Sequence, residues 1–346
     1  MRQDYITQKY TTSWDELPKV FVWLWYLLIV RNIIKSVLNE IYQKQNEPDL
    51  IKECTIAAVR IDDGVVLAKN RDRGYKARVE IIHELIDDVE IVYWRDIDTD
   101  WSEGMNEFGI GIVNSSLLVA QDEKEGKGVE KERKTENKEK DKTVKRKFAA
   151  DGGKIRKALT YKTLPKVIKS IISFRGEDKK DVGLKGETIV SDNKNIYVIE
   201  MTAKHSPIIK KLKQDSKLVV RTNHGIFQKG AGYTRGEKRK SSLIRMELAK
   251  NHLKNVKKDL DVINVMKKKY KKDPFLNPYR TKNMYHMQTT GQIMMNLEEK
   301  IVLVRMDNEM GEFVGIENKL PKNYEPKIKI KVESEKTHHE GKKLPS

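Results

Sequence analysis

One short stretch, residues 54–72, constrains the fold more than any other part of the chain. Two runs rich in Val, Ile and Ala flank Asp63-Gly64, a dipeptide that readily supplies the positive φ angles of a tight hairpin turn. Strands joined in this way lie side by side, so the end of the second returns to the start of the first. At roughly 3.3 Å per residue, the hairpin predicts that Asp72 lies beside Cys54. A thiol next to a carboxylate at the mouth of a sheet suits a nucleophile.

Cys54 is the single cysteine of the chain, and it has two interpretations. Cysteine is among the most buried residue types, so a lone one often fills a core without reacting. The other interpretation is a catalytic thiol, which needs a base and donors for the developing oxyanion. One cysteine also excludes an intramolecular disulfide bond.

The residues around Cys54 favour the second interpretation. Cys54-Thr55, the hairpin and then Lys69-Asn70-Arg71-Asp72 resemble the opening of the choloylglycine hydrolase, penicillin V acylase and isopenicillin N acyltransferase group. Similar segments follow in the same order, namely Gly104–Asn114, Asp151–Leu159, Ser191-Asp192 with Tyr197–Glu200, and Arg221–His224. The similarity covers most of residues 54–306 in short motifs. Members of this group are N-terminal-nucleophile (Ntn) hydrolases, in which Cys becomes the first residue of the mature chain.

The order of predicted elements indicates an α+β fold. Residues 76–88 predict a short helix, and the remaining expected elements fall into two sets. Helices are expected within 154–174 and over 241–256 and 259–270, and strands over 89–97, 108–114, 188–191, 196–201, 218–222 and 301–305. The resemblance implies more, a four-layer αββα sandwich preceded by a helical pro-segment. It divides the chain into a pro-segment at 1–53, a catalytic domain at 54–316 with a charged insertion at 122–147, and a basic tail at 317–346.

A pro-segment at 1–53 implies a cut between Glu53 and Cys54. The working base of this class is the α-amino group of the nucleophile, which exists only after that cut. Its ordinary pKa of about 8 suits proton transfer near neutral pH. The alternative is that residues 1–53 form a helical subdomain and that Cys54 is internal and inert.

Three polar residues receive roles from the resemblance. Asp72 matches the aspartate that hydrogen-bonds the amine of the nucleophile, although an ion pair with Arg71 or Arg73 is the alternative. Asn223 matches the oxyanion-hole asparagine, whose alternative role is that of a turn former. Asn114 is a weaker match, because its strand is shorter than in the bile-salt enzymes.

Two basic residues complete the candidate site. Lys69 stands where many members of the group have Arg, so the charge is kept and the bidentate fork is lost. Arg245 is the best candidate for the later active-site arginine of the group, although an arginine on a helix surface explains it equally well. The seven histidines show no ligand spacing, so no metal or cofactor is expected.

The net charge of +18 favours acidic partners or simply a solvated lysine-rich surface. Aromatic residues do not interleave with the basic runs, so no specific nucleic acid is expected. Residues 122–147 are almost entirely charged and predict a solvated insertion. The apolar run Val20–Val30 is too short to cross a bilayer and lacks the features of a secretory signal. We therefore expect a cytoplasmic protein, with peripheral membrane contact through residues 20–45 and oligomerisation left open.

These observations predict a self-processing cysteine Ntn hydrolase. It cleaves a linear carbon–nitrogen amide bond, or transfers the acyl group, through an acyl-enzyme on Cys54. Its partner is a small-molecule or peptide amide substrate. The alternative is a catalytically silent Ntn-like scaffold that acts as a basic binding or structural protein.

Overall fold

The computed structural model describes residues 30–31, 52–117, 152–173, 183–202, 206–281, 287–306 and 311–334. The chain divides into two units, Met1–Ile51 and Lys52–Ser346, and the second contains the fold described below. Residues 30 and 31 are helical. The rest of the predicted segment before Lys52, and the charged insertion at 122–147, lie outside the described residues.

The larger unit is built mainly from strands, with a few helices. The strands are β1 Lys52–Ile61, β2 Gly64–Arg73, β3 Ala77–Ile86, β4 Val89–Asp96, β5 Ser102–Asn106, β6 Gly111–Ser115, β7 Gly186–Ser191, β8 Ile196–Met201, β9 Ile208–Lys211, β10 Leu218–Arg221, β11 Gln288–Asn296, β12 Ile301–Met306, β13 Gly311–Asn318 and β14 Lys329–Ser334. The helical elements are a helix at 152–159, α4 Leu164–Ser173, α5 Gly236–Leu253, α6 Asp259–Lys267 and the 3₁₀ turn η3 Pro274–Leu276. The predicted α+β class is confirmed.

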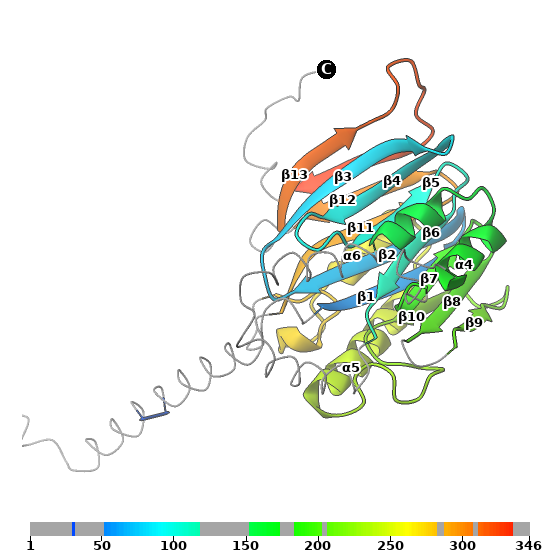
Figure 1. Cartoon of the computed structure of the whole chain (residues 1–346). Coiled ribbons are helices and arrows are strands. Elements are labelled where there is room, and N and C mark those ends of the chain that lie inside the picture. The colour runs from blue at the N-terminus through cyan, green and yellow to red at the C-terminus, as the bar shows by residue number, and fades with distance from the viewer. Residues whose placement is uncertain are drawn as a thin grey trace, which may run out of the picture. The chain divides into compact units, whose positions relative to one another are not determined.

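These strands form two sheets (Figure 1). The six-stranded sheet has the order β10-β1-β2-β11-β12-β14, and the eight-stranded sheet has the order β13-β3-β4-β5-β6-β7-β8-β9. Neighbouring strands are antiparallel except for β12 with β14 and β13 with β3. The hairpin β1–β2, which carries Cys54, therefore lies inside the smaller sheet, flanked by β10 and β11.

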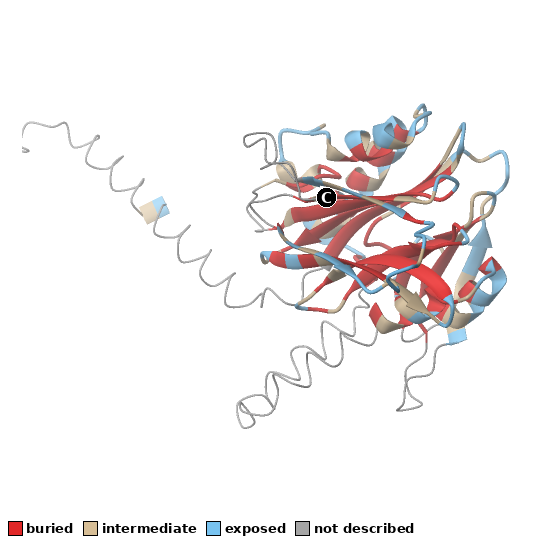
Figure 2. Ribbon diagram, turned by 90° about the horizontal axis from the view of Figure 1, so that it is seen from above, coloured by how far each residue is buried: buried red, intermediate tan, exposed pale blue. Residues whose placement is uncertain are grey.

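Three apolar clusters connect these layers, and Figure 2 shows the buried residues that run along the central strands. The first lies between the two sheets and joins, for example, Ile56 and Ile293 to Val92. The second packs the eight-stranded sheet against α4 and the helix at 152–159. The third packs the six-stranded sheet against α5 and α6. Both faces of β1 and β2 are thus covered, which explains why their sequences are nearly continuous apolar runs at the hairpin end.

The hairpin turn lies one residue earlier than predicted. Asp62 and Asp63 form the turn, and Ile61 pairs with Gly64. Gly64 has φ +117°, and an added Cβ would lie 3.0 Å from the Cβ of Glu298, so this position favours glycine. The resulting register places Asp72 opposite Glu53, whereas Cys54 pairs with Arg71.

Two sequence predictions are wrong. Residues 76–88 were expected to be helical, yet Ala77–Ile86 is strand β3, paired with both β13 and β4. The apolar residues of this segment fit the repeat of a helix as well as that of a strand. Hydrogen bonding to a neighbouring strand on each side stabilises the strand. The predicted tail at 317–346 begins too early, because β14 pairs with β12 and Ile328 is buried. Residues 335–346 lie outside the described part of the chain.

The strand predicted over 196–201 is β8, with the same bounds. The two helices predicted over 241–256 and 259–270 are α5 and α6, with shifted ends. In the part of the chain that the structure describes, no helix combines the length and the apolar character needed to cross a membrane.

Candidate active site

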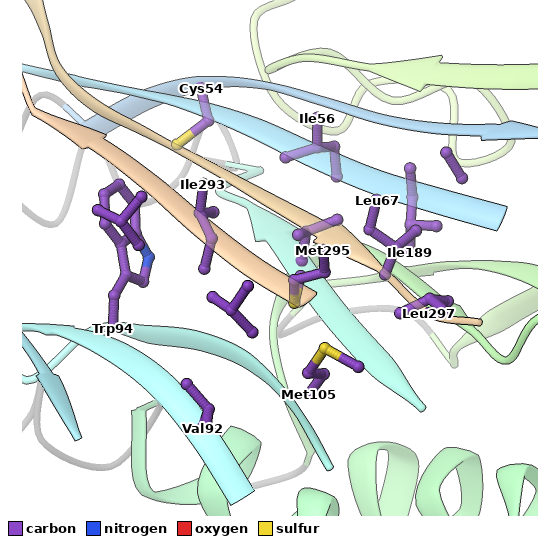
Figure 3. Close-up of a cluster of buried hydrophobic side chains, with 14 of the residues drawn as sticks. Cys54, Ile56, Leu67, Val92, Trp94, Met105, Ile189, Ile293, Met295 and Leu297 are labelled. Carbon is purple, nitrogen blue, oxygen red and sulfur yellow. The ribbon is translucent and has the colours of Figure 1, made fainter. Parts of the chain in front are cut away.

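Cys54 is the third residue of β1, and its side chain faces the interior between the two sheets. The side chain is 2% exposed and belongs to the apolar cluster between the sheets. Figure 3 shows its sulfur pointing into the space that Ile293 and Trp94 line. Since side chains alternate along a strand, Glu53 and Thr55 face the opposite side, toward α5. Asp72 also faces that side, so the predicted contact between Asp72 and the thiol is wrong by one position in the register.

Every polar atom of the Glu53–Cys54 peptide group contacts a buried polar side chain. The Cys54 N–H donates to Asn223 Oδ1 at 3.1 Å. The Glu53 carbonyl oxygen accepts a hydrogen bond from Arg73 Nη1 at 3.4 Å, and the same nitrogen lies 3.9 Å from Cys54 Sγ. One guanidinium therefore contacts both the thiol and the carbonyl oxygen of the adjacent peptide bond.

A row of cations lies on the thiol face of β2. Lys69, Arg71 and Arg73 alternate along the strand, so they project to the same side as Cys54, and all three are buried. Glu103 of β5 accepts hydrogen bonds from two of these cations and from two indoles, namely Lys69 Nζ, Arg71 Nη2 at 2.6 Å, Trp94 Nε1, and Trp101 Nε1 at 2.6 Å. Burial alone would raise the pKa of Glu103, but Arg71 and Lys69 lower it to about 2. Burial lowers the pKa of Lys69 from its ordinary value.

The cations on this face outnumber the carboxylates that pair with them. Asp96 lies 3.6 Å from Arg71 Nη1 and 3.9 Å from Arg73 Nε, and Glu103 pairs with Lys69 and Arg71. Three cations thus share two carboxylates. Burial pulls the pKa of Arg73 down, but nearby acidic groups raise it overall, so this guanidinium stays charged. The excess positive charge favours any negative charge that develops at the sulfur or at the adjacent carbonyl oxygen.

A second polar cluster lies on the opposite face of the hairpin, against α5. Glu53 is fully buried, and its carboxylate accepts from Tyr233 Oη at 3.0 Å and from Arg245 Nη2 at 2.9 Å, and pairs with Arg280 Nη2 at 2.8 Å. Burial would raise the pKa of Glu53, but the two arginines lower it. Glu53 is therefore an ionised side chain held by three donors.

Asp72 shares the same two arginines. Its Oδ2 lies 3.6 Å from Arg280 Nη1 and 3.8 Å from Arg245 Nη1, while Thr289 Oγ1 donates to Oδ1 at 2.7 Å. Burial raises the pKa of Asp72 above its ordinary value despite the two cations. Asp72 is thus linked to Cys54 through Arg245, which contacts the Cys54 carbonyl oxygen, and not through the thiol.

Arg245 of α5 contacts the main chain of Cys54 from the face opposite the thiol. It is fully buried, so it is not the helix-surface arginine that the sequence left open. Its Nη1 donates to the Cys54 carbonyl oxygen at 2.8 Å and to Thr55 Oγ1 at 3.0 Å, and its Nη2 donates to Asn223 Oδ1 at 3.0 Å. Burial, and then the neighbouring Arg280, lower the pKa of Arg245.

Asn223 lies beside Cys54, but its amide is oriented to accept. A guanidinium can only donate, so the atom facing Arg245 and the Cys54 N–H is Oδ1. The amide nitrogen donates instead to Ser115 Oγ and to the Ser116 carbonyl oxygen, both at 3.1 Å. In the intact chain Asn223 therefore positions the Cys54 nitrogen, and its own donor does not face the Glu53 carbonyl.

Asn114 is not brought to the thiol. It is buried on β6, where Val113 faces the space between the sheets and Asn114 faces the helices. Its amide nitrogen donates to Thr188 Oγ1 at 2.7 Å, and only its main-chain carbonyl reaches the site, by accepting from Lys69 Nζ at 2.7 Å. The proposed substrate-facing amide is therefore a link between β6 and β7.

Sequence reasoning did not select several residues of the two polar clusters. Arg73, Asp96 and Glu103 belong to the thiol face, and Tyr233 and Arg280 to the face against α5. A signal for Arg73 was available, because Lys69, Arg71 and Arg73 place cations at every second position of a strand predicted to be buried. No local pattern marks Tyr233 or Arg280, which lie in connecting segments. Among the described residues no group of three His, Cys, Asp or Glu side chains could hold a metal ion.

A buried carboxylate next to this site is expected to weaken the fold. Glu187 pairs with Ser115 across β6–β7, and burial raises its pKa well above 4.5. The folded chain then holds this proton more tightly than the unfolded chain, so the stability it contributes is present below about pH 4.5 and is lost as the pH rises. Glu187→Gln should therefore raise Tm at pH 7, by about 2–4 °C per kcal/mol gained.

Thermal denaturation at pH 7 and near pH 4 checks this expectation. The gain from Glu187→Gln should shrink at the lower pH, where the wild-type side chain is itself protonated. The matched control is Glu317→Gln, because Glu317 is 49% exposed and its ion pair with Lys319 is screened by solvent. A lower Tm for Glu187→Gln at pH 7 would show that the ionised form is the one the fold stabilises.

Comparisons with known proteins show similarity at the level of structure and not of sequence. No protein-family model and no curated protein matches the sequence. Among solved structures, the chain is similar to penicillin V acylase from Agrobacterium tumefaciens, with 10% sequence identity and a TM-score of 0.35 over 74% of this chain and 86% of that one.

Proposed function

We propose that this chain is a self-processing cysteine hydrolase of the N-terminal-nucleophile type, acting on a linear amide. One observation supports this most strongly. The peptide bond before Cys54 has its carbonyl oxygen and the adjacent thiol on the same buried cation, Arg73, and its N–H on Asn223. An unreactive cysteine that only fills the core does not require these contacts.

The proposed processing reaction begins with attack of Cys54 Sγ on the Glu53 carbonyl carbon. A carbon–sulfur bond forms, and Arg73 Nη1 donates to the oxygen that becomes negative. The carbon–nitrogen bond then breaks, and the thiol proton ends on the Cys54 nitrogen, which becomes a free amine. Water hydrolyses the thioester, which leaves Glu53 with a main-chain α-carboxylate and restores the thiol.

The mature reaction uses the same groups with a substrate amide in place of the peptide bond. The freed α-amine of Cys54 accepts the thiol proton, since its ordinary pKa of about 8 allows both states near neutral pH. The sulfur attacks the substrate carbonyl, and the amine product leaves with the proton. Water completes hydrolysis of the acyl-enzyme, whereas an acceptor amine completes acyl transfer.

The proposal includes two statements about the fold. Residues 1–53 act as the pro-segment, and the larger unit is the αββα sandwich of this enzyme class. The order of the three apolar clusters supports the sandwich, because helices pack on the outer face of each sheet and the sheets pack on each other. In this scheme Lys69 and Arg73 stabilise charge on the thiol side, Asn223 positions the amine, and Arg245 with Asp72 orients the strand from the other side.

Arg73→Gln should slow self-processing strongly while the chain still folds. Removing one donor to a developing oxyanion typically reduces the rate about 100- to 1000-fold. The measurement is the fraction of cleaved chain over time, from intact mass and N-terminal sequencing. Arg78→Gln is the matched control, because Arg78 is 51% exposed on β3 and pairs with Asp98. Processing of Arg73→Gln at the wild-type rate would remove Arg73 from the mechanism.

A panel of fluorogenic amides tests the mature activity. The purified protein should begin at Cys54 and release the fluorophore from at least one linear amide. A protein that begins at Met1 and hydrolyses none of them would instead be the silent scaffold of the alternative interpretation.

A further inference from the structure

We propose that the pocket occupied by the Glu53 carboxylate is an anion subsite of the mature enzyme, and that it binds the terminal carboxylate of a dicarboxylic acyl chain such as glutaryl. The inference rests on the proposed function, because it requires the chain to be cut after Glu53. It names the substrate class that the sequence leaves open.

The pocket is built for a carboxylate. Arg245, Arg280 and Tyr233 come from three separate parts of the chain and all direct a donor at Glu53. Both arginines are fully buried, and Tyr233 is 7% exposed. Charge-assisted hydrogen bonds in a site shielded from water discriminate strongly between an anion and a neutral group.

The donors are held by contacts that do not involve Glu53. Arg280 Nε donates to the Phe275 carbonyl oxygen at 3.2 Å, its Nη2 donates to Ser241 Oγ at 2.8 Å, and its guanidinium lies 4.2 Å from the Phe275 ring centre. Arg245 is held by the Cys54 carbonyl oxygen and Thr55 Oγ1. The pocket therefore keeps its geometry when Glu53 leaves, and such preorganisation favours binding of a replacement.

Loss of Glu53 also leaves a charge imbalance. In the intact chain two guanidiniums face two carboxylates, Glu53 and Asp72. After the cut only Asp72 remains, and an unpaired buried cation is strongly unfavourable. An anion that enters this pocket restores the balance.

The covalent structure of Glu53 sets the length of the acyl chain. Its carbonyl is the acyl group that Cys54 first takes up in the proposed processing reaction, and its side chain connects that carbonyl to the pocket. A substrate acyl group at the same carbonyl position reaches the same donors when its carboxylate has the carbon spacing of glutamate. A glutaryl group has that spacing.

The test compares glutaryl and valeryl amides of one fluorogenic amine, aminomethylcoumarin, on the processed wild-type protein. The two acyl chains have equal length and differ in the terminal carboxylate. We expect kcat/KM to favour the glutaryl amide by about 10- to 100-fold, the range for charge-assisted hydrogen bonds in a buried site. Arg280→Met should reduce this ratio by a similar factor, and Arg280→Lys should restore part of it. Arg78→Met is the control, because Arg78 is 51% exposed and pairs with Asp98 at the surface.

Two further measurements test the subsite if the Arg280 variants do not fold. Tyr233→Phe removes a single donor and should lower the same ratio by a smaller factor. Free glutarate should inhibit hydrolysis of the valeryl amide by the wild-type protein at concentrations at least about 10-fold lower than valerate does.

The outcomes separate the subsite from the proposed function. A processed protein that hydrolyses both amides equally and is not inhibited by glutarate overturns the subsite and leaves the hydrolase intact. A protein that stays uncut and hydrolyses neither amide overturns both, because Glu53 then remains in the pocket permanently.

Discussion

Cys54→Ala is expected to remain a single chain of 346 residues, while the wild-type protein separates into pieces of 53 and 293 residues (346 minus 53). The substitution removes the only thiol, and with it the atom that attacks the Glu53 carbonyl. It leaves the hydrogen bonds of Asn223 and Arg245 to the Cys54 main chain in place. Intact mass and N-terminal sequencing measure the difference directly.

Cys54→Ser is the informative companion variant. Its hydroxyl keeps the shape of the site but is a weaker nucleophile than a thiolate, so processing should be slow rather than absent. Cleavage of Cys54→Ala after Glu53 would show that another protease makes the cut. A wild-type protein that is active and still begins at Met1 would contradict the α-amine mechanism.

Arg245→Met is expected to destabilise the protein more than any surface substitution. The methionine fills much of the volume but leaves Glu53 and Asp72 with one guanidinium, Arg280, between them. Removing one partner of a buried charged group typically costs about 3–5 kcal/mol. For a unit of this size that corresponds to a decrease in Tm of about 6–20 °C, measured by thermal denaturation. Processing should also be lost, because Arg245 holds the Cys54 carbonyl.

Two controls make this prediction specific. Arg78→Met removes an arginine that is 51% exposed and pairs with Asp98, and its Tm should change by no more than about 2 °C. Adding Glu53→Gln to Arg245→Met removes the carboxylate that lost its partner and should recover part of the stability. A Tm for Arg245→Met within about 2 °C of wild type would mean that the buried cluster contributes little to folding.

The sequence predicts correctly those helices and strands whose residue pattern fits only one type of secondary structure. The β1–β2 hairpin was recognised because a turn dipeptide separates two β-branched runs, and α5 and α6 because their residues favour helix over a long segment. The helix predicted over 76–88 is wrong, because Ile81, Ile82, Leu85 and Ile86 fit one face of a helix as well as a strand. Pairing with β4 and β13 decided that segment, and neither partner is visible in the local sequence.

For the candidate site, the sequence identified several of the residues but not the face of the sheet on which each side chain lies. Cys54, Asp72, Asn223 and Arg245 were selected from short motifs, and three of them meet within one hydrogen-bonded group. The face on which each side chain lies was not available from those motifs. Successive residues of a strand point to opposite faces, so an error of one position in the cross-strand pairing moves a side chain to the other face of the sheet. Asp72 pairs with Glu53 rather than with Cys54 and faces α5, whereas Arg73 lies beside the thiol.

The sequence by itself determined an α+β chain with a hairpin at its single cysteine, together with a set of polar residues that suit acyl transfer. Propensity and spacing act over neighbouring residues, so they fix such local features. The tertiary structure decided that Glu53 is enclosed by Arg245, Arg280 and Tyr233, and that Arg73 contacts both the thiol and the carbonyl before it. Glu53 and Arg245 are 192 residues apart, and contacts at such separations form only because burying both sheets and their helices brings these segments together.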